Sequence, residues 1–139
     1  RLFNIYLHHI RHSDDDRALH DHPWWNCSIV LSGGYVEIVP EKGFSHGVLR
    51  RLMRLPGSIT FRRASTAHRL EVPEGVTAWT LFITGPVIRE WGFHCPNGWV
   101  HWKDFVDERD TGAVGRGCGE HDDPRADKVV TIPHRGRIG

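Results

Sequence analysis

The stretch LHDHPWWNCSIVLSGG, residues 19–34, decides how the chain is interpreted. It begins with two histidines one residue apart, His20 and His22, and continues into an apolar run that ends at a pair of glycines. Residues i and i+2 of a strand project from the same face, about 6.6–6.8 Å apart along the chain, so both imidazoles can reach one metal ion. An isolated H-x-H at a strand end is more often a pair of ordinary polar residues without a metal. A metal site therefore needs a third ligand from elsewhere in the chain.

The sequence around this stretch predicts an all-β fold. Runs of β-branched and aromatic residues alternate with glycine and proline turn signals over most of residues 2–94. The predicted strands are 3–10, 24–31, 35–39, 48–55, 58–61, 68–72, 78–84 and 87–93. Short strands at this spacing indicate a sandwich or barrel, not alternating strands and helices. One short helix is predicted late, over 100–109, where Trp102, Phe105, Val106 and Arg109 share a face.

The 139 residues correspond to one domain with a C-terminal extension. From Thr111 onward the chain is rich in glycine and charge and nearly free of large apolar residues. We therefore expect a β domain over 1–110 and an extended C-terminal arm over 111–139, in which 129–134 could add one strand. The arm is expected to wrap a neighbouring subunit in a homodimer.

The composition excludes several classes of protein. No apolar run approaches the ~18 residues of a membrane span, and no secretion signal is visible. Three cysteines, Cys27, Cys95 and Cys118, are too few and too scattered for a disulfide framework, which predicts a reducing, cytoplasmic setting. A net charge of +1 makes nucleic-acid binding an unfavoured hypothesis. The 11 histidines, and six arginines between residues 50 and 69 without an acidic residue among them, favour imidazole chemistry near an anion.

The spacing of the histidines resembles the two motifs of the cupin superfamily, G-x5-H-x-H-x3,4-E-x6-G and G-x5-P-x-G-x2-H-x3-N. His20 and His22 match the H-x-H of the first motif, and Gly33 matches its last glycine. Gly57 and His68 match the glycine and the histidine of the second motif. At the other motif positions the chain has a different residue: Asp14 in place of Gly, Asn26 in place of Glu, Arg63 in place of Pro, Ser65 in place of Gly and Val72 in place of Asn. The resemblance covers residues 14–72 and implies a double-stranded β-helix, or jelly-roll barrel.

The resemblance also implies a metal site formed by His20, His22 and His68. Three neutral imidazoles leave open positions on a divalent ion, which suits Fe(II), Mn, Co, Ni or Zn. Asn26 stands where the carboxylate ligand belongs, so the site lacks a negative ligand and resembles that of the thiol dioxygenases, whose metal is Fe(II). A more positive metal favours a small anionic substrate, such as a carboxylate or phosphate.

Three further residues are candidates for roles beside the metal. An arginine such as Arg62, just before His68, can clamp an anion with two hydrogen bonds. Asn26 could bind the metal weakly or hold a water. His94 could steer a water or a proton.

These features leave several functions open. The first is a non-haem Fe(II) dioxygenase or oxidase. The second is an oxygen-independent decarboxylase, isomerase or lyase that uses another divalent metal as a Lewis acid. The third is a ligand-binding sensor without chemistry, and a fourth, least favoured, is modification of nucleotides or nucleic acid.

Overall fold

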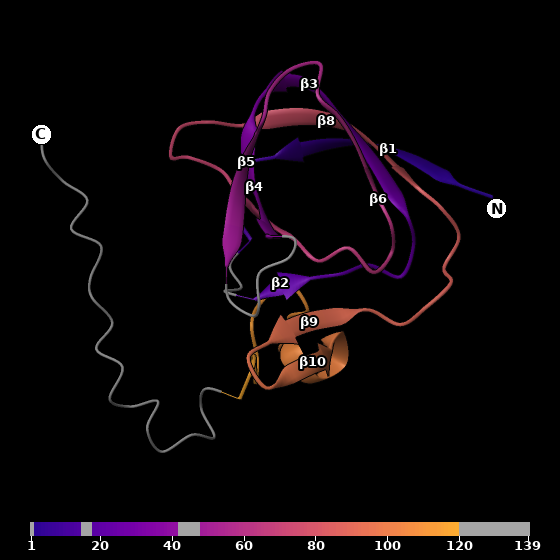
Figure 1. The fold of residues 1–139 in the computed structure, drawn as a ribbon, viewed down its shortest axis with the longest axis vertical. Helices are drawn as coiled ribbons and strands as arrows, with labels where there is room; N and C mark the ends of the chain where they lie inside the picture. The colour runs from indigo at the N-terminus through magenta and orange to yellow at the C-terminus, as the bar shows by residue number, and fades with distance from the viewer. Residues whose placement is uncertain (1, 15–17, 42–47, 120–139) are drawn as a thin grey trace, which may run out of the picture.

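The computed structural model describes residues 2–14, 18–41 and 48–119, and it contains antiparallel strands and one short helix (Figure 1). The strands are β1 (Asn4–Ile10), β2 (Leu19–His20), β3 (Asn26–Gly33), β4 (Tyr35–Pro40), β5 (Leu49–Arg54), β6 (Ile59–Arg62), β7 (Arg69–Glu71), β8 (Ala78–Thr84), β9 (Gly92–Cys95) and β10 (Gly98–His101). The helix is α1 (Trp102–Phe105). The all-β prediction is confirmed.

Three sheets organise these strands. The four-stranded sheet has the order β1-β8-β3-β6, and a three-stranded sheet with the order β5-β4-β7 lies beside it in the barrel (Figure 1). A second three-stranded sheet, β10-β9-β2, lies at one end of the barrel together with α1. The two-residue strand β2 therefore joins the barrel to this end sheet, and it carries His20.

Alternation along the strands places small apolar and polar residues inside the barrel. Val30, Tyr35 and Ala78 form one buried cluster in the barrel. A separate buried cluster of Phe93, Phe105 and Ala18 joins the end sheet to α1. The rings of Phe93 on β9 and Phe105 on α1 stack with their centroids 3.6 Å apart, so α1 packs against β9.

Two predicted elements differ from the structure. The predicted strand 87–93 begins only at Gly92, because residues 86–91 cross from the barrel to the end sheet. On that crossing the Ile88 amide donates to the Pro23 carbonyl instead of joining a strand ladder. The predicted helix 100–109 is shorter than expected, since 100–101 belong to β10 and Val106 pairs with Val114 in an isolated bridge.

The sequence predicts no disulfide framework, and the structure contains a single disulfide among its described residues. Cys95 at the end of β9 is bonded to Cys118, and Cys27 is free. The sequence distance of 23 residues hides a Cα–Cα separation of 5.5 Å, which the fold of the intervening β10, α1 and turn creates. The cytoplasmic location inferred from the cysteines stays a prediction.

The first nine residues of the predicted arm pack against the domain. The amides of Gly115 and Gly117 both donate to the Phe105 carbonyl, and Cys118 is covalently tied to β9. Residues 120–139, which include the predicted strand 129–134, lie outside the described residues. In the part of the chain that the structure describes, no helix has the length and apolar character needed to cross a membrane.

Candidate metal centre

Three histidines from separate segments meet at one point of the barrel. One ring nitrogen from each of His20, His22 and His68 lies within 4.8 Å of the others. The backbones of His20 and His68 form an antiparallel bridge, in which each amide donates to the other residue's carbonyl at 2.9 and 3.0 Å. The structure thus brings together the three residues that the sequence selected as metal ligands.

A buried carboxylate orients one of these histidines. Glu37 on β4 accepts a hydrogen bond from Nδ1 of His68 at 2.7 Å, and its side chain is almost fully buried. Because a carboxylate only accepts, the bond places the His68 proton on Nδ1 and leaves the Nε2 lone pair free. Carboxylates behind metal-binding histidines serve this purpose in many metal sites.

The ring atoms left free are suited to a metal ion. Nε2 of His22 and Nε2 of His68 lie 2.9 Å apart. Two nitrogens bound to one ion at about 2.0–2.1 Å stand roughly 3 Å apart, so the observed separation fits two ligands of one ion. Without an ion, the same separation allows a hydrogen bond between the rings.

The environment keeps two of the imidazoles neutral. Burial, reinforced by the nearby His68, lowers the pKa of His20 to about 3. Burial and the neighbouring His20 lower the pKa of His22 to about 2. Since only the neutral imidazole can donate a lone pair, both residues are in the state that binds metal at neutral pH.

Glu37 also anchors two arginines in the barrel interior. Nε of Arg62 and Nε of Arg54 both donate to its carboxylate, Arg54 at 2.7 Å. Burial would raise the pKa of Glu37, but the hydrogen bonds from His68 and Arg62 outweigh it and lower the pKa below its usual range. The face of β5 that carries Arg54 therefore lines the interior.

Asn26 and Arg62 lie beside each other and are both buried. They are direct cross-strand partners on β3 and β6, and Nη1 of Arg62 donates to Oδ1 of Asn26 at 3.1 Å. Nδ2 of Asn26 and Nη2 of Arg62 are buried without a hydrogen-bond partner among the described residues. Two buried donors that lack an acceptor are costly unless a ligand or water satisfies them.

His94 occupies a different position from the other candidates. In the β2–β9 pairing His20 lies opposite Phe93, whereas His94 lies opposite Leu19 and on the other face. There Nε2 of His94 contacts Asp21 at 3.0 Å. His94 therefore lies against Asp21, the residue between His20 and His22, and not against the ring nitrogens of these two histidines.

Asp21 and Glu37 are the two residues that the sequence analysis missed. Asp21 is almost fully buried and accepts hydrogen bonds from the Gly92 amide at 2.9 Å and from Nε1 of Trp99 at 3.0 Å. Asp21 lies between His20 and His22, so strand alternation places its side chain on the opposite face from theirs. This alternation could have identified it from the sequence. Glu37 in the run YVEIV was also detectable, as a charged residue inside a strand pattern that is otherwise apolar.

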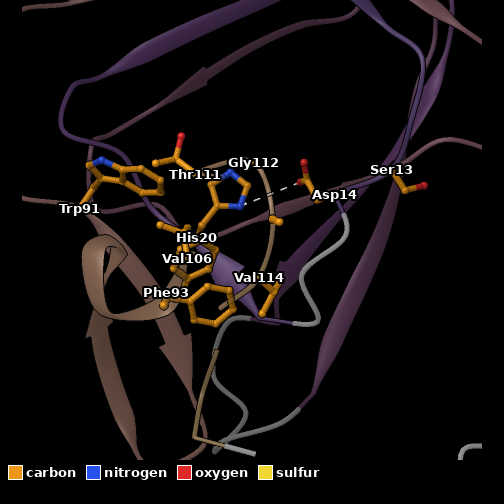
Figure 2. A pocket seen from close by; sticks show the side chains of 11 residues that line it. Ser13, Asp14, His20, Trp91, Phe93, Val106, Thr111, Gly112 and Val114 are labelled. Atoms are coloured by element: carbon orange, nitrogen blue, oxygen red, sulfur yellow. Dashed lines mark ion pairs between the residues drawn. The ribbon is translucent and has the colours of Figure 1, made fainter. Parts of the chain in front are cut away.

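A cavity of about 260 Å³ reaches His20 from the end sheet (Figure 2). Aromatic and aliphatic side chains, including Trp91, Phe93 and Val114, form part of its wall. Asp14 and Ser13 add polar groups, and Nδ1 of His20 lies 3.9 Å from Oδ2 of Asp14. The segment Thr111–Val114 closes one side, so the start of the predicted arm is part of the cavity wall.

Comparison with known proteins gives matches of structure only. No protein-family model and no curated protein sequence matches the chain. The polyketide cyclase RemF from Streptomyces resistomycificus is similar in fold, with a TM-score of 0.52 and 18% identity over 91% of this chain and 72% of that chain. RmlC from Streptococcus suis, solved with dTDP-D-xylose, has a TM-score of 0.50 and 13% identity over 81% of this chain and 65% of that chain.

A third match covers one part of a longer protein. A point mutant of the oxalate decarboxylase OxdC from Bacillus subtilis has a TM-score of 0.50 and 17% identity, over 80% of this chain and 27% of that chain. These neighbours are cupins, proteins of the double-stranded β-helix fold. Together with the antiparallel strands of this chain, they show that it has the double-stranded β-helix fold.

Proposed function

We propose that the protein is a metal-dependent enzyme that acts on a small anionic substrate, with His20, His22 and His68 as the metal ligands. The observation that carries the proposal is the convergence of three ring nitrogens, with Glu37 fixing the free lone pair of His68. A bound divalent ion would supply Lewis acidity and, as Fe(II), the redox chemistry of oxygen. We favour Fe(II) and a dioxygenase or oxidase because the site has no carboxylate ligand.

The anionic character of the substrate is inferred from Asn26 and Arg62. Their unpaired Nδ2 and Nη2 atoms are donors, and an anion offers the acceptors that they lack. Arg62 stays charged, because burial would lower its pKa but hydrogen bonding and charge from Glu37 raise it. These two residues would bind and orient the substrate. His94 would act through Asp21, holding the backbone between the two histidines in place.

Metal analysis tests the ligand set. The wild-type protein, stripped with a chelator and reloaded with Fe(II) under anaerobic conditions, is expected to retain one ion per chain. His20→Ala, His22→Ala and His68→Ala are each expected to lose most of it, whereas His12→Ala, at an exposed histidine, retains it. Circular dichroism checks that each variant is folded. Wild-type metal content in a folded His68→Ala variant would overturn the proposal.

Nitric oxide binding distinguishes the oxygen-dependent reaction from the oxygen-independent one. Nitric oxide is a surrogate for O₂ and gives a characteristic electron paramagnetic resonance signal on Fe(II) with an open position. We expect this signal in the wild-type Fe(II) protein. Its absence in a fully loaded protein would argue against the dioxygenase and for a decarboxylase, isomerase or lyase.

A further inference from the structure

Four aromatic side chains form a continuous strip that begins at the candidate metal centre. The Trp24 ring stacks on His22 with centroids 4.7 Å apart, and the Phe82 ring meets Trp24 edge to face at 5.7 Å. His8 stacks on Phe82 at 4.9 Å, and Tyr6 stacks on His8 at 5.6 Å. This aromatic strip, formed by Trp24, Phe82, His8 and Tyr6, leads from a candidate metal ligand to β1 at the edge of the four-stranded sheet.

The aromatic strip lies on the inner face of the four-stranded sheet. Tyr6, Phe82 and Ser28 are direct cross-strand partners on β1, β8 and β3. Two residues further along the strands, Thr84 and Asn26 are partners and are both almost fully buried, which identifies this face as the inner one. Because side chains two residues apart share a strand face, the rings and Asn26 line the same interior.

The strip stays accessible although it faces inward. Tyr6 is 45% exposed. Trp24 and Phe82 are only half-buried, whereas Thr80 and Val30 on the same face are almost fully buried. Binding sites for small molecules are lined mainly by apolar and aromatic side chains with a few polar groups among them. Partly exposed rings beside buried polar groups fit such a site better than they fit a closed core.

Hydrogen-bond donors that lack an acceptor lie beside the strip. Nη1 of Arg62 donates to Oγ of Ser28 at 2.9 Å, and Ser28 is the cross-strand neighbour of Phe82. Such neighbours have Cβ atoms about 4.5–5.5 Å apart. Nη2 of Arg62 and Nδ2 of Asn26 are the two donors without a partner among the described residues. The ring surface and the unpaired donors are therefore neighbours on one face of the sheet.

We propose that the aromatic strip binds the ring of an aromatic carboxylate, while Arg62 and Asn26 bind its carboxylate group. This inference rests on the proposed function and narrows its small anionic substrate to one that carries a planar ring. Aromatic rings in offset-stacked or edge-to-face contact gain about two- to tenfold in affinity beyond the effect of the area they bury. A saturated ring of the same size gains only from the buried area, so the strip distinguishes the two.

Titration of the full, metal-free chain with benzoate and with cyclohexanecarboxylate tests the proposal. The two probes have the same number of carbon atoms and the same charge, but only benzoate has an aromatic ring. The nuclear magnetic resonance signals of the tryptophan indole N–H groups report binding. The Trp24 signal should shift, whereas the signal of Trp79, on the outer face of β8, should not. Wild type is expected to bind benzoate about tenfold more tightly than cyclohexanecarboxylate.

Leucine variants remove single rings from the strip and keep an apolar side chain. Phe82→Leu and Tyr6→Leu are each expected to lower the preference for benzoate at least about threefold. Tyr6 is the more exposed of the two, so its variant decides if Phe82→Leu does not fold. Trp79→Leu makes a matched change on the outer face and should keep the wild-type preference. Asn26→Asp should weaken both probes alike, because its negative charge repels either carboxylate.

Three results would overturn the proposal: equal affinities of wild type for the two probes, binding of neither probe, or an unchanged preference in the folded leucine variants. The titration needs no metal, so it is independent of the metal analysis. Wild-type metal content in His68→Ala together with a preference for benzoate would overturn the proposed metal ligands and not the ring site. Equal affinities in a protein that passes the metal analysis would overturn the aromatic substrate class alone.

Discussion

The Nε2 atoms of His22 and His68 lie 2.9 Å apart, although the two residues are separated by 46 positions in the sequence. Backbone hydrogen bonds between His20 and His68 hold the two segments together, and Glu37 fixes the His68 ring. The protein itself therefore sets the positions of the rings, so that a metal ion would enter a largely formed site.

Glu37→Gln is expected to weaken metal binding. The substitution removes the charge that holds the Nδ1 proton of His68, and loss of such a partner typically costs 10–100-fold in metal affinity. It also leaves Arg62 without its buried counter-charge, so the melting temperature should fall. Competition with a chelator measures the affinity. Glu41→Gln, at a partly exposed carboxylate 3.5 Å from Arg50, is the control and should change neither property.

A folded Glu37→Gln protein with wild-type metal affinity would show that Glu37 only balances the arginines. The double variant Glu37→Gln/Arg62→Met separates the two roles. It should recover part of the thermal stability, because the fully buried cation is gone and only the partly exposed Arg54 still lacks the Glu37 charge, but it should not recover metal affinity.

Acid is expected to destabilise the metal-free protein through His20 and His22. Their folded-state pKa values of about 3 and about 2 lie below the ordinary 6.5. The unfolded chain therefore binds more protons between pH 6.5 and 3, and stability is lost as the pH falls through this window. Each histidine contributes a slope of at most about 1.4 kcal/mol per pH unit.

Urea denaturation of the metal-free protein at pH 7.5 and pH 5 measures this loss. The loss should be smaller in His22→Gln than in wild type, because glutamine does not titrate. His12→Gln, at an exposed position, should match wild type. An equal loss in His22→Gln and wild type would contradict the prediction.

Asn26→Asp is expected to change metal and anion binding in opposite directions. A carboxylate at this fully buried position adds a negative charge near the three histidines, where the family motif has Glu. Metal affinity should rise, whereas binding of azide to the Co(II) protein, followed by its visible spectrum, should weaken by about tenfold or more. Asn97→Asp, in an exposed turn, makes the same chemical change and should have no effect. Unchanged azide binding in Asn26→Asp would place the anion elsewhere.

Cys118→Ser is expected to lower stability and to disturb the cavity wall. A disulfide that closes a loop of 23 residues contributes about 3.5 kcal/mol in the loop-entropy description. Cys27→Ser, at the free thiol, serves as the control. Mass spectrometry of the protein from its native source, with thiols blocked at lysis, would show whether the bond forms there. Fully reduced Cys95 and Cys118 would support the predicted cytoplasmic setting.

The three histidines of the candidate site could be predicted because their signal is local. His20 and His22 share a strand face, and His68 follows a glycine at a fixed distance, so spacing alone selected them. Glu37 was missed since its role depends on how β4 packs between β5 and β7, which no spacing rule states. The disulfide was missed for a related reason, because the path of β10 and α1 determines where Cys118 returns.

The short elements were also beyond reach of the sequence. The two residues of β2 show no alternation of their own, and they form a strand only because β9 and His68 lie beside them. The aromatic strip was visible in part, since alternation in β1 places Tyr6 and His8 on one face. Which side of the strands pointed inward became clear only with the register of all four strands.

Asp21 shows how one short segment can meet two demands at once. Its side chain points away from the ring nitrogens and accepts hydrogen bonds from Gly92 and Trp99, while its two neighbours face the site. In a scan of all single substitutions, positions 20, 21 and 22 would look equally intolerant. In separate assays of abundance and metal content, we expect the middle position to fail by misfolding and the outer two by losing metal.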